Sequence, residues 1–539
     1  MKKSLIFLLI ALCLVMPTFA NGKNESNENS EGSSQQSAVS ESSSNEDTIT
    51  MAMVSTWDSL IPFDTTSSYS GVILDLIYDK LVYLKADGTY EPRLAESVEM
   101  NEDSTVMTFN LRKDAYWSDG EPVTAADVVF TAKAYASPSV NALRKNQCNN
   151  FVGFGESDDS LAVKALDDYT VEFQLTEPTN KDFLLFTKFR DIYILPEHLL
   201  NDVPLKDIRT SSYWDNPVSS GPCVYEKEIT GERIEFSANQ NYYNTPEWDK
   251  FVVRVVPTSN LLAGLMNGEI DCLAGNVASL QLSDWDMAQQ QKNLVCNSLP
   301  AVNYQYMAIN TSKSYMTSEI RRIINMTINR ELIVDGLLQG EGVQVFGPIP
   351  PNNIYYNDEI EEPYNPEEAK KLLAESGWDY NRTLIMSVPS GNTIREQAAV
   401  IIQQNLAEIG MKAKIVTADF ATHLNRVRKG DYDFGFIGSS GSPDPSECVI
   451  NFNPDHINNF SQLSDWTIFE TGDKGGHVFG FEDRKICYDE YQKLLRQEVP
   501  FAFLYSSNLL EAHNKNITGI ENLADSTQLN HDVWNWKIK

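Results

Sequence analysis

Residues 261–275 read LLAGLMNGEIDCLAG, a stretch that combines a helix, a glycine and a strand. Its apolar residues recur at the spacing of one helix face, at Leu261, Leu262, Leu265 and Met266. Gly268 follows, at a place where a helix end requires a left-handed residue. Residues 270–273 then begin a short apolar strand. Because this αβ step follows an apolar strand at residues 251–256, we interpret that strand as the crossing from one lobe into another.

The length of 539 residues predicts at least two lobes, because a single core stops growing near about 250–300 residues. The composition is that of a globular protein, with 42% hydrophobic and 22% charged residues. The formal net charge of −32 argues against a nucleic-acid partner, since neutralising phosphates requires an excess of Lys and Arg. We expect most of this charge to lie on an acidic, solvated surface.

The N-terminal sequence has the pattern of a secretory signal peptide, expected over residues 1–20. Lys2 and Lys3 precede an apolar run, and small residues follow it. Residues 21–47 are polar and suit a flexible tether. We therefore expect an exported protein, in the periplasm or at the outer face of the cytoplasmic membrane. Lipid attachment at Cys13 stays open: the tether favours it, but the large Leu12 before it does not fit a good lipoprotein signal.

Six further cysteines leave room for disulfides in an exported chain. Proximity in the sequence makes Cys272–Cys296 and Cys448–Cys487 plausible pairs, although the sequence does not determine the connectivity. No cysteine has the spacing of a metal site.

Several local signals predict individual elements. A helix is expected over residues 71–84, and a β-hairpin is expected where residues 94–100 turn back into 106–111. Thr124 and Asp127 form a capping-box pattern before another helix. Residues 317–337 are expected to form one long helix. Asn365, followed by a proline and two glutamates, predicts a strong helix start.

Alternating strands and helices after the expected crossing predict an α/β fold of two lobes. Residues 257–496 are interpreted as one continuous α/β lobe, and the other lobe is formed by the segments on either side. Two crossings between the lobes would form a hinged cleft, and ligands favour such interfaces between domains.

Catalytic and cofactor motifs are absent from the sequence. It contains no G-x-S-x-G, H-E-x-x-H, P-loop or G-x-G-x-x-G pattern, and its six histidines are scattered without a metal-binding spacing. We therefore expect neither an enzyme nor a bound cofactor or metal.

Nine short segments, taken together, resemble one protein family. They are PRLAESVE (92–99), FNLRKDAYWSDGEPVTAADV (109–128), NPVSSGPCVY (216–225), GEID (268–271), YMAINTS (306–312), INRE (328–331), GPIPP (347–351), YNPEEAKKLLAESGW (364–378) and GDYDF (430–434). In this order they resemble the large extracytoplasmic solute-binding proteins of ABC importers, which take oligopeptides, dipeptides, nickel and some oligosaccharides. Each segment alone is weak, whereas the set is specific.

This resemblance implies a two-lobed periplasmic-binding-protein fold with an extra inserted domain. Lobe I would comprise residues 48–76, 205–256 and 497–539, with the inserted domain at 77–204 and lobe III at 257–496. The lobes would close on a ligand, and the protein, expected to be a monomer, would deliver it to a membrane permease with its ATPases.

The resemblance also bears on the ligand. Peptide binders of the family usually hold the ligand's amino group with an aspartate in a lobe III loop. The register places that residue near Gly441, in GSSGSPDP, where no carboxylate stands unless Asp444 replaces it. Peptides remain the favoured ligand class, oligosaccharides are the alternative because of the serines and aromatic residues, and nickel is least favoured.

The candidate ligand-binding residues combine aromatic faces with polar loop positions. They are Trp57, Tyr69, Asn303, Tyr304, Ser439, Ser440, Ser442 and Asp444. Two other classes stay open, a secreted hydrolase and a peptide-sensing receptor subunit. Activity on peptides or glycosides would identify the first, and a membrane sensor partner would identify the second.

Overall fold

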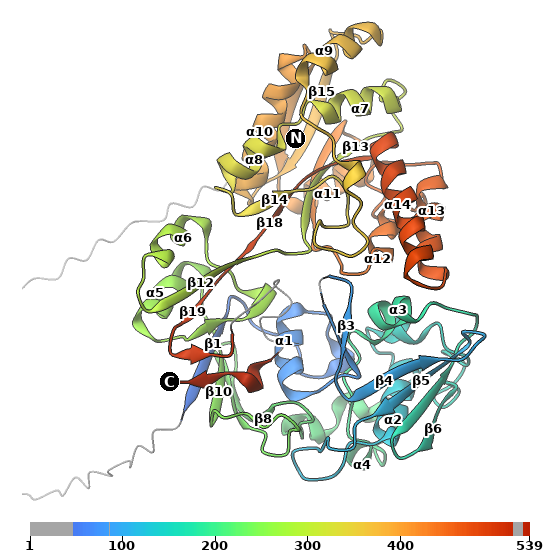
Figure 1. Ribbon diagram of the computed structural model, residues 1–539, viewed down its shortest axis with the longest axis vertical. Helices are drawn as coiled ribbons and strands as arrows, with labels where there is room; N and C mark the ends of the chain where they lie inside the picture. Colours follow the sequence, from blue (N-terminus) through green and yellow to red (C-terminus); the bar gives the residue numbers. More distant parts are fainter. Residues whose placement is uncertain (1–46, 86, 521–531) are drawn as a thin grey trace, which may run out of the picture. The chain divides into compact units, whose positions relative to one another are not determined.

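The computed structural model describes residues 47–85, 87–520 and 532–539 (Figure 1). The expected signal peptide and all but the last residue of the expected tether lie outside these ranges. Within them, no helix combines the length and the apolar character needed to cross a membrane.

A five-stranded sheet forms the centre of lobe I, in the order β11-β1-β10-β9-β8. These strands are β1 (Thr48–Met53), β8 (Cys223–Ile229), β9 (Arg233–Ala238), β10 (Lys250–Val255) and β11 (Cys272–Leu273). Strand β1 pairs in parallel with both β10 and β11, which the helix α5 (Leu261–Asn267) connects. Strand β9 alternates buried and half-buried residues, as expected for a sheet with one face on the core.

The helix–glycine–strand unit at 261–275 forms as predicted, and Gly268 ends α5 with φ +71°. Its expected place in lobe III is wrong. Strand β11 adds to the edge of β1, and the side chains of α5 and β11 belong to the same buried cluster as β1 and β10. The strand at 251–256 is therefore not a crossing, because the parallel β10–α5–β11 connection returns the chain to the sheet that it left.

A second sheet, in the order β4-β5-β7-β6, lies within the expected inserted domain. Its strands are β4 (Ala95–Met100), β5 (Val106–Leu111), β6 (Val163–Asp167) and β7 (Thr170–Gln174). The predicted β4–β5 hairpin is confirmed by antiparallel pairing of Ala95 with Leu111. Helices α2 (Ala125–Ala136), α3 (Lys181–Leu184) and α4 (Glu197–Leu200) accompany it, and the capping box at Thr124 and Asp127 is formed. A shorter hairpin joins β2 (Val82–Leu84) to β3 (Tyr90–Pro92).

Lobe III contains a six-stranded mixed sheet in the order β14-β18-β13-β17-β15-β16. The strands are β13 (Tyr304–Ile309), β14 (Gly342–Gln344), β15 (Thr383–Pro389), β16 (Lys412–Ala418), β17 (Phe434–Ser439) and β18 (Phe501–Ser507). Buried side chains form two hydrophobic clusters in this lobe, one that includes Met307 and Phe434 and one that includes Tyr306 and Ile437. Because these pairs alternate along β13 and β17, the sheet carries a core on each face.

Eight helices of the described chain belong to lobe III. They are α7 (Ser318–Met326), α8 (Arg330–Leu337), α9 (Pro366–Glu375), α10 (Thr393–Glu408), α11 (Phe420–Arg428), α12 (Ser446–Val449), α13 (Thr467–His477) and α14 (Phe481–Glu498). The predicted cap of α9 is confirmed, since the Asn365 side chain accepts a hydrogen bond from the Glu368 amide at 3.1 Å.

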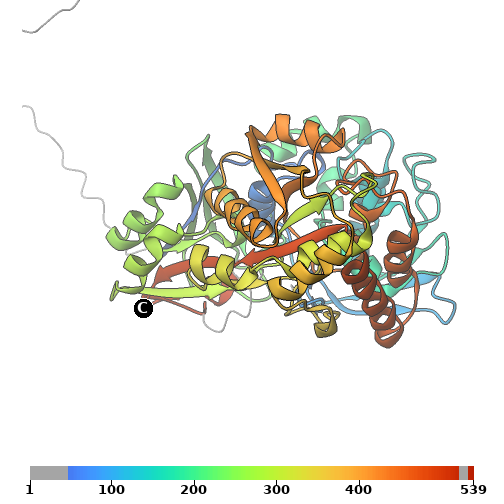
Figure 2. The same ribbon diagram turned by 90° about the horizontal axis from the view of Figure 1, so that it is seen from above.

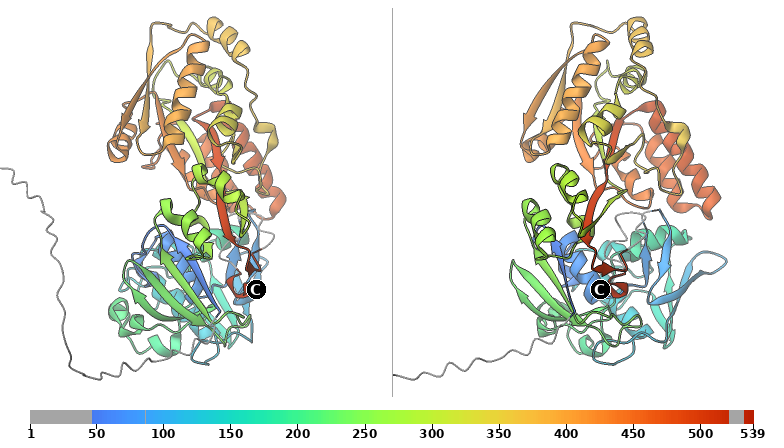
Figure 3. Two further views of the ribbon diagram at one scale, coloured as in Figure 1. Left: turned by 90° about the vertical axis from the view of Figure 1, so that its left-hand side faces the viewer. Right: turned by 60° about the vertical axis from the view of Figure 1, so that its left-hand side comes forward.

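The two crossings between the lobes are formed by strands that run on from one sheet into the next (Figures 1, 2 and 3). Strand β12 (Leu294–Leu299) pairs with β19 (Leu509–Asn514), and their continuations β13 and β18 pair in the lobe III sheet. The links are residues 300–303 on one side and Asn508 alone on the other. The segment 261–299 therefore belongs to lobe I, and β18 belongs to lobe III rather than to the expected 497–539 part of lobe I. Helix α6 (Leu282–Gln289) precedes β12, and β20 (Ile517–Thr518) pairs with β21 (Lys537–Ile538) near the C-terminus.

Two predicted helices have different limits. The helix expected at 71–84 is α1 (Ser68–Ile77), because Tyr78 is extended and the chain continues into β2. The helix expected at 317–337 is divided into α7 and α8, because Asn329 caps a new helix by accepting a hydrogen bond from the Leu332 amide.

The proposed disulfides are also wrong. All six cysteines in the described ranges are free, and four of them are buried, at positions 148, 223, 272 and 448. Burial raises the pKa of the Cys148 thiol to about 12, which leaves it protonated and unreactive.

Candidate ligand-binding site

A cavity of about 410 Å³ lies where residues of lobe I, the inserted domain and lobe III meet. Its lobe I and inserted-domain walls are formed by α1, the residues that follow it, β2 and the segment 190–193. Its lobe III wall is formed by Ser440, Gly441 and Pro443, from the loop between β17 and α12, and Val302 lies in the first crossing. The volume falls within the range of small-molecule sites.

Helix α1 brings its first turn and its polar face to this cavity. Ser67 caps the helix by accepting a hydrogen bond from the Tyr69 amide at 3.2 Å. Behind the first turn, Asp58 accepts hydrogen bonds from the hydroxyls of Thr65 and Ser70, each at 2.6 Å. These contacts hold the N-terminal end of α1, so that the Asp75 side chain on the same helix has a defined position in the wall.

A buried ion pair supports the floor of the cavity. The Arg93 Nε donates to Asp79 Oδ1 at 3.0 Å, and the Tyr243 hydroxyl donates to Asp79 Oδ2 at 2.6 Å. The guanidinium also lies 4.3 Å from the centre of the Trp534 ring. Burial alone would lower the pKa of Arg93, but the charge of Asp79 more than offsets this and raises it. Asp79 is therefore held by protein groups, and we regard the pair as structural.

Three further cations gather around Asp191 in the same wall. Arg144 Nη1 lies 2.6 Å and Arg190 Nε 3.4 Å from Asp191 Oδ2, so two guanidinium groups share one carboxylate. Lys80 forms an ion pair with Asp75 at 2.6 Å and lies 4.7 Å from the centre of the Tyr193 ring. Burial would raise the pKa of Asp191, but the charges of Arg190, Arg144 and Lys80 lower it below its ordinary value.

The opposite wall is a loop that packs directly on the first crossing. Gly441 adopts φ +67°, and a Cβ atom at this position would lie 1.7 Å from the Val302 carbonyl oxygen. The Gly441 amide donates to Ser439 Oγ at 3.1 Å. No side chain fits at position 441 in this conformation, so an aspartate there would require a different loop.

Of the eight candidate residues, the structure places only Ser440 in the wall of this cavity. Ser439 and Ser442 shape the loop instead, because each accepts a hydrogen bond from a backbone amide two residues on. Asn303 joins the two crossings, since its Nδ2 donates to the Ser507 carbonyl at 3.0 Å. Trp57 and Tyr69 are half-buried and pack on the core of lobe I. A ligand-binding role for any of these residues stays a prediction.

Tyr304 does not line the cavity. Its side chain is only 2% exposed and packs in the lobe III core, with its ring centre 5.5 Å from that of Phe503. It lies on β13, opposite Ser439, and faces the core cluster rather than the cavity. In the sequence, an aromatic residue in an apolar strand looks the same whether it packs in a core or lines a ligand cavity. Only the packing in the structure distinguishes these two roles.

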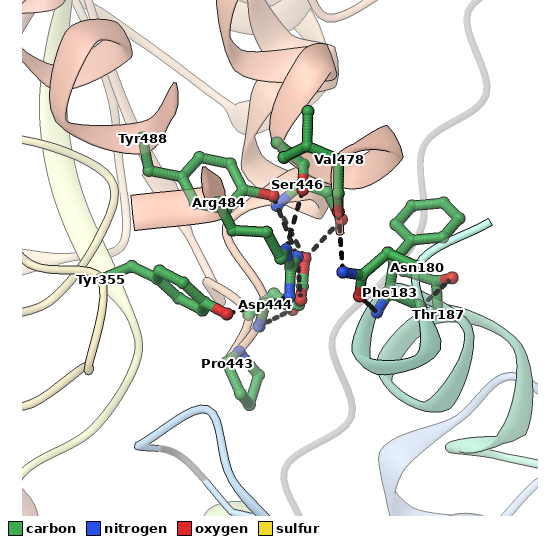
Figure 4. A network of polar contacts seen from close by, with 12 residues as sticks. Asn180, Phe183, Thr187, Tyr355, Pro443, Asp444, Ser446, Val478, Arg484 and Tyr488 are labelled. Atoms are coloured by element: carbon green, nitrogen blue, oxygen red, sulfur yellow. Dashed lines mark hydrogen bonds and ion pairs between the residues drawn. The ribbon is translucent and has the colours of Figure 1, made fainter. Parts of the chain in front are cut away.

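Asp444 is also committed to the interior of lobe III (Figure 4). Its Oδ2 accepts from Arg484 Nη2 at 2.8 Å, and both side chains are almost completely buried. The same guanidinium reaches the Gly475 carbonyl and the Tyr488 hydroxyl, at 2.8 and 3.1 Å. Burial alone would lower the pKa of Arg484, and the charge of Asp444 reverses this effect and raises it. Asp444 therefore cannot act as the amino-group ligand without breaking this pair.

Two polar contacts join the inserted domain to lobe III. Arg190 Nη1 lies 2.9 Å from Glu447 Oε2, and Asn180 Nδ2 donates to the Val478 carbonyl at 2.7 Å (Figure 4). The Arg190–Glu447 pair is about one third exposed on both sides. Arg190 thus takes part in the cavity wall and in the contact between the two lobes.

Sequence reasoning missed the charged wall. Its cations Lys80, Arg144 and Arg190 are separated by up to 110 positions and form no local motif. One signal was present for two of them, since Asp79 precedes Lys80 and Asp191 follows Arg190, but adjacent opposite charges are common on protein surfaces.

A cavity between two α/β lobes that are joined by paired crossings defines a periplasmic-binding-protein fold, as the sequence predicted. A family model described as "Bacterial extracellular solute-binding proteins, family 5 Middle" matches residues 89–459, and the chain belongs to this family of ABC importer solute-binding proteins.

Individual relatives agree with this assignment. The dipeptide-binding protein of Escherichia coli K12 is 27% identical over 468 residues, covering 82% of this chain and 86% of its own. Heme-binding protein A of Haemophilus influenzae is 29% identical over 461 residues, covering 79% and 80%. The crystal structure of the ABC transporter substrate-binding protein CtaP from Listeria monocytogenes is similar in fold, with a TM-score of 0.80 and 23% identity over 91% of this chain and 99% of that one.

Proposed function

We propose that this protein captures short peptides in the cavity between its lobes and delivers them to the permease of an ABC importer. The observation that carries the proposal is the cavity itself, because α1 and the Gly441 loop contribute opposite walls from different lobes. A ligand in this position contacts both lobes and stabilises their closed arrangement, which is the state that a transporter can distinguish from the empty one.

The size of the cavity favours a small ligand. A volume of about 410 Å³ lies toward the lower end of the range of small-molecule sites, which is about 300–1,000 Å³. A dipeptide or a small tripeptide has this size, whereas a longer oligopeptide requires the lobes to separate further. The two relatives of similar identity carry different ligand names, so identity alone does not decide between ligand classes.

An oligosaccharide is less well supported. Of the 22 residues that line the cavity, four are cations and three are carboxylates. Placing a neutral sugar there would desolvate these charges without giving them a charged partner. Trp57 and Tyr304, the aromatic residues expected to stack on sugar rings, are not among the lining residues.

The ligand class is tested by purifying the protein from residue 21, denaturing it and analysing released compounds by mass spectrometry. Masses of di- and tripeptides are expected. Masses separated by hexose units would instead establish the oligosaccharide function. If nothing is released, a thermal-shift series with peptides and sugars decides, because a ligand at 100 times its Kd should stabilise the fold by about 2.7 kcal/mol.

Export and the membrane partner belong to the same proposal. The protein would act outside the cytoplasmic membrane as a monomer, without a cofactor and without catalysis, and lipid anchoring at Cys13 is one way to keep it near the permease. Co-purification of the tagged full-length protein with permease subunits from detergent extracts would support delivery. Association with a sensor protein instead would establish a receptor role.

A further inference from the structure

The cavity is lined by four cations and three carboxylates, whereas the chain as a whole has a formal net charge of −32. Four cations line it, at Lys80, Arg93, Arg144 and Arg190. Arg93 is held in the floor by Asp79 and Tyr242, at 3.0 and 2.9 Å. Arg144 and Arg190 both pair with Asp191, and Lys80 pairs with Asp75. The charges of all three cations lower the pKa of Asp191.

Arg144 and Arg190 have more N–H donors than the neighbouring protein groups accept. Arg144 uses Nη1 for Asp191 and Nε for the Thr65 carbonyl, and Arg190 uses Nε for Asp191 and Nη1 for Glu447. In the described part of the chain, Nη2 has no hydrogen-bond partner in either arginine. A guanidinium group binds a carboxylate best through two parallel N–H groups, so a ligand carboxylate can use donors that the protein leaves over.

The other charged end of a peptide finds no comparable partner. Position 441 has no room for a side chain, and Asp444 is buried in its pair with Arg484. The carboxylates Asp75, Asp79 and Asp191 do line the cavity, but each already has a cation within 3.0 Å. A free ammonium group on the ligand would have to compete with those cations for the carboxylates. A ligand carboxylate would instead be a further partner for the cations.

We propose that the ligand is recognised through a carboxylate, bound by Arg190 with Arg144 and Lys80 on the wall opposite the Gly441 loop, and that a free amino group is not required. This inference rests on the proposed peptide-binding function and names the end of the peptide that determines affinity. Because Arg190 also pairs with Glu447 of lobe III, the carboxylate would bind beside the contact that joins the lobes.

The test uses the full mature protein and a mixture of di- and tripeptides of Ala, Leu and Phe, prepared in three forms. One form has both ends free, one is amidated at the C-terminus and one is acetylated at the N-terminus. Retained peptides are separated from free ones by gel filtration and quantified by mass spectrometry. Losing a charge-paired group usually weakens binding by at least about 30-fold, so amidation should have this effect and acetylation should change affinity less than threefold.

Variants locate the subsite. Arg190→Gln should weaken the binding of free-acid peptides by at least tenfold. It should also remove most of the difference in affinity between free-acid and amidated peptides. Arg190→Lys should recover part of the lost affinity. Arg428→Gln, an exposed arginine on α11 outside the cavity, is the matched control and should bind as the wild type does. Thermal melting of each variant establishes that it is folded. The comparison of free-acid and amidated peptides uses the wild-type protein and does not depend on any variant.

The outcomes separate the two proposals. Equal retention of acid and amide peptides would overturn the carboxylate inference and leave the peptide function standing. Loss on acetylation alone would also overturn it and would point to Asp75 as an amino-group ligand. Retention of no peptide in any form would overturn the proposed function and the inference together.

Discussion

Single residues in the cavity wall act through shape as much as through charge. The serines and aromatic residues selected from the sequence have suitable chemistry, yet Tyr304 packs in a core and Ser439 and Ser442 hold a loop. The sequence indicated that no carboxylate stands near Gly441 unless Asp444 replaces it, and the way in which an amino group would be bound stays a prediction. It could not identify the cations, because Lys80 and Arg190 are brought together only by the packing of α1 against the segment that contains Tyr193.

Gly441→Ala should weaken ligand binding at least tenfold, or by about 1.4 kcal/mol. The new Cβ would lie 1.7 Å from the Val302 oxygen, so the loop must move away from the crossing and distort the cavity. Titration calorimetry with a released or retained peptide measures the effect. Gly377→Ala is the matched control, since Gly377 also has a positive φ, of +75°, but has open space around its Cβ position. Equal affinities for both variants would contradict the expectation.

His423 should make the folded protein less stable in acid. The side chain is buried, and burial together with the charges of Arg395 and Arg426 lowers its pKa from 6.5 to about 4. Between these values only the unfolded chain takes up the proton, so stability falls as the pH decreases below 6.5. The loss between pH 6.5 and pH 5 should be about 2 kcal/mol.

Urea unfolding at several pH values measures this dependence. His423→Gln should flatten the curve in this window, whatever its effect on stability at pH 7. His477→Gln is the control, because His477 is half-exposed and Asp473 raises its pKa through a hydrogen bond. If the free energy of unfolding of His423→Gln changed with pH as steeply as that of the wild type, the acid sensitivity would belong to other groups.

At the scale of elements, the sequence predicted best where a local rule decides the structure. The β4–β5 hairpin, the capping box of α2 and the start of α9 are set by neighbouring residues and occur as expected. The ends of α1 and α7 were missed, because the apolar pattern continues past both. Tyr78 becomes extended where the chain enters β2, and Asn329 starts a new helix within what reads as one helical stretch.

Asn365→Ala should reduce the free energy of unfolding by about 1 kcal/mol, the usual loss for an N-cap. The Asn365 side chain accepts from the Glu368 amide, and alanine would leave that amide without its cap. Urea denaturation measures the change. Lys371→Ala, at an exposed interior position of the same helix, should alter stability by less than about 0.5 kcal/mol. A larger effect at Lys371 than at Asn365 would contradict the role of the cap.

At the scale of the whole molecule, the sequence predicted two lobes and two crossings but misplaced both crossings. The strand at 251–256 has the composition of a connecting strand, and its true partner, β1, lies about 200 residues earlier. The pairing of two strands so far apart in the sequence cannot be predicted from the local pattern of either strand. The crossings at 300–303 and at Asn508 are instead the short links between β12 and β13 and between β18 and β19.

Glu447→Gln should shift the empty protein toward separated lobes. Its partly exposed pair with Arg190 joins the inserted domain to lobe III, and pairs of this exposure contribute about 0.5–1 kcal/mol. The ratio of separated to closed molecules should therefore rise about two- to fivefold, which small-angle X-ray scattering detects as a larger radius of gyration. Glu362→Gln, which removes a pair within lobe III, should leave the scattering unchanged. A radius unaffected by Glu447→Gln would show that this pair does not hold the lobes.

The free thiols have a practical consequence. No disulfide joins the cysteines of the described chain, so the described fold does not depend on disulfide formation. Cys487, a half-buried thiol on α14 of lobe III, is a natural attachment point for a dye. A fluorophore there, paired with one introduced on lobe I, would turn this protein into an optical reporter of its own ligand.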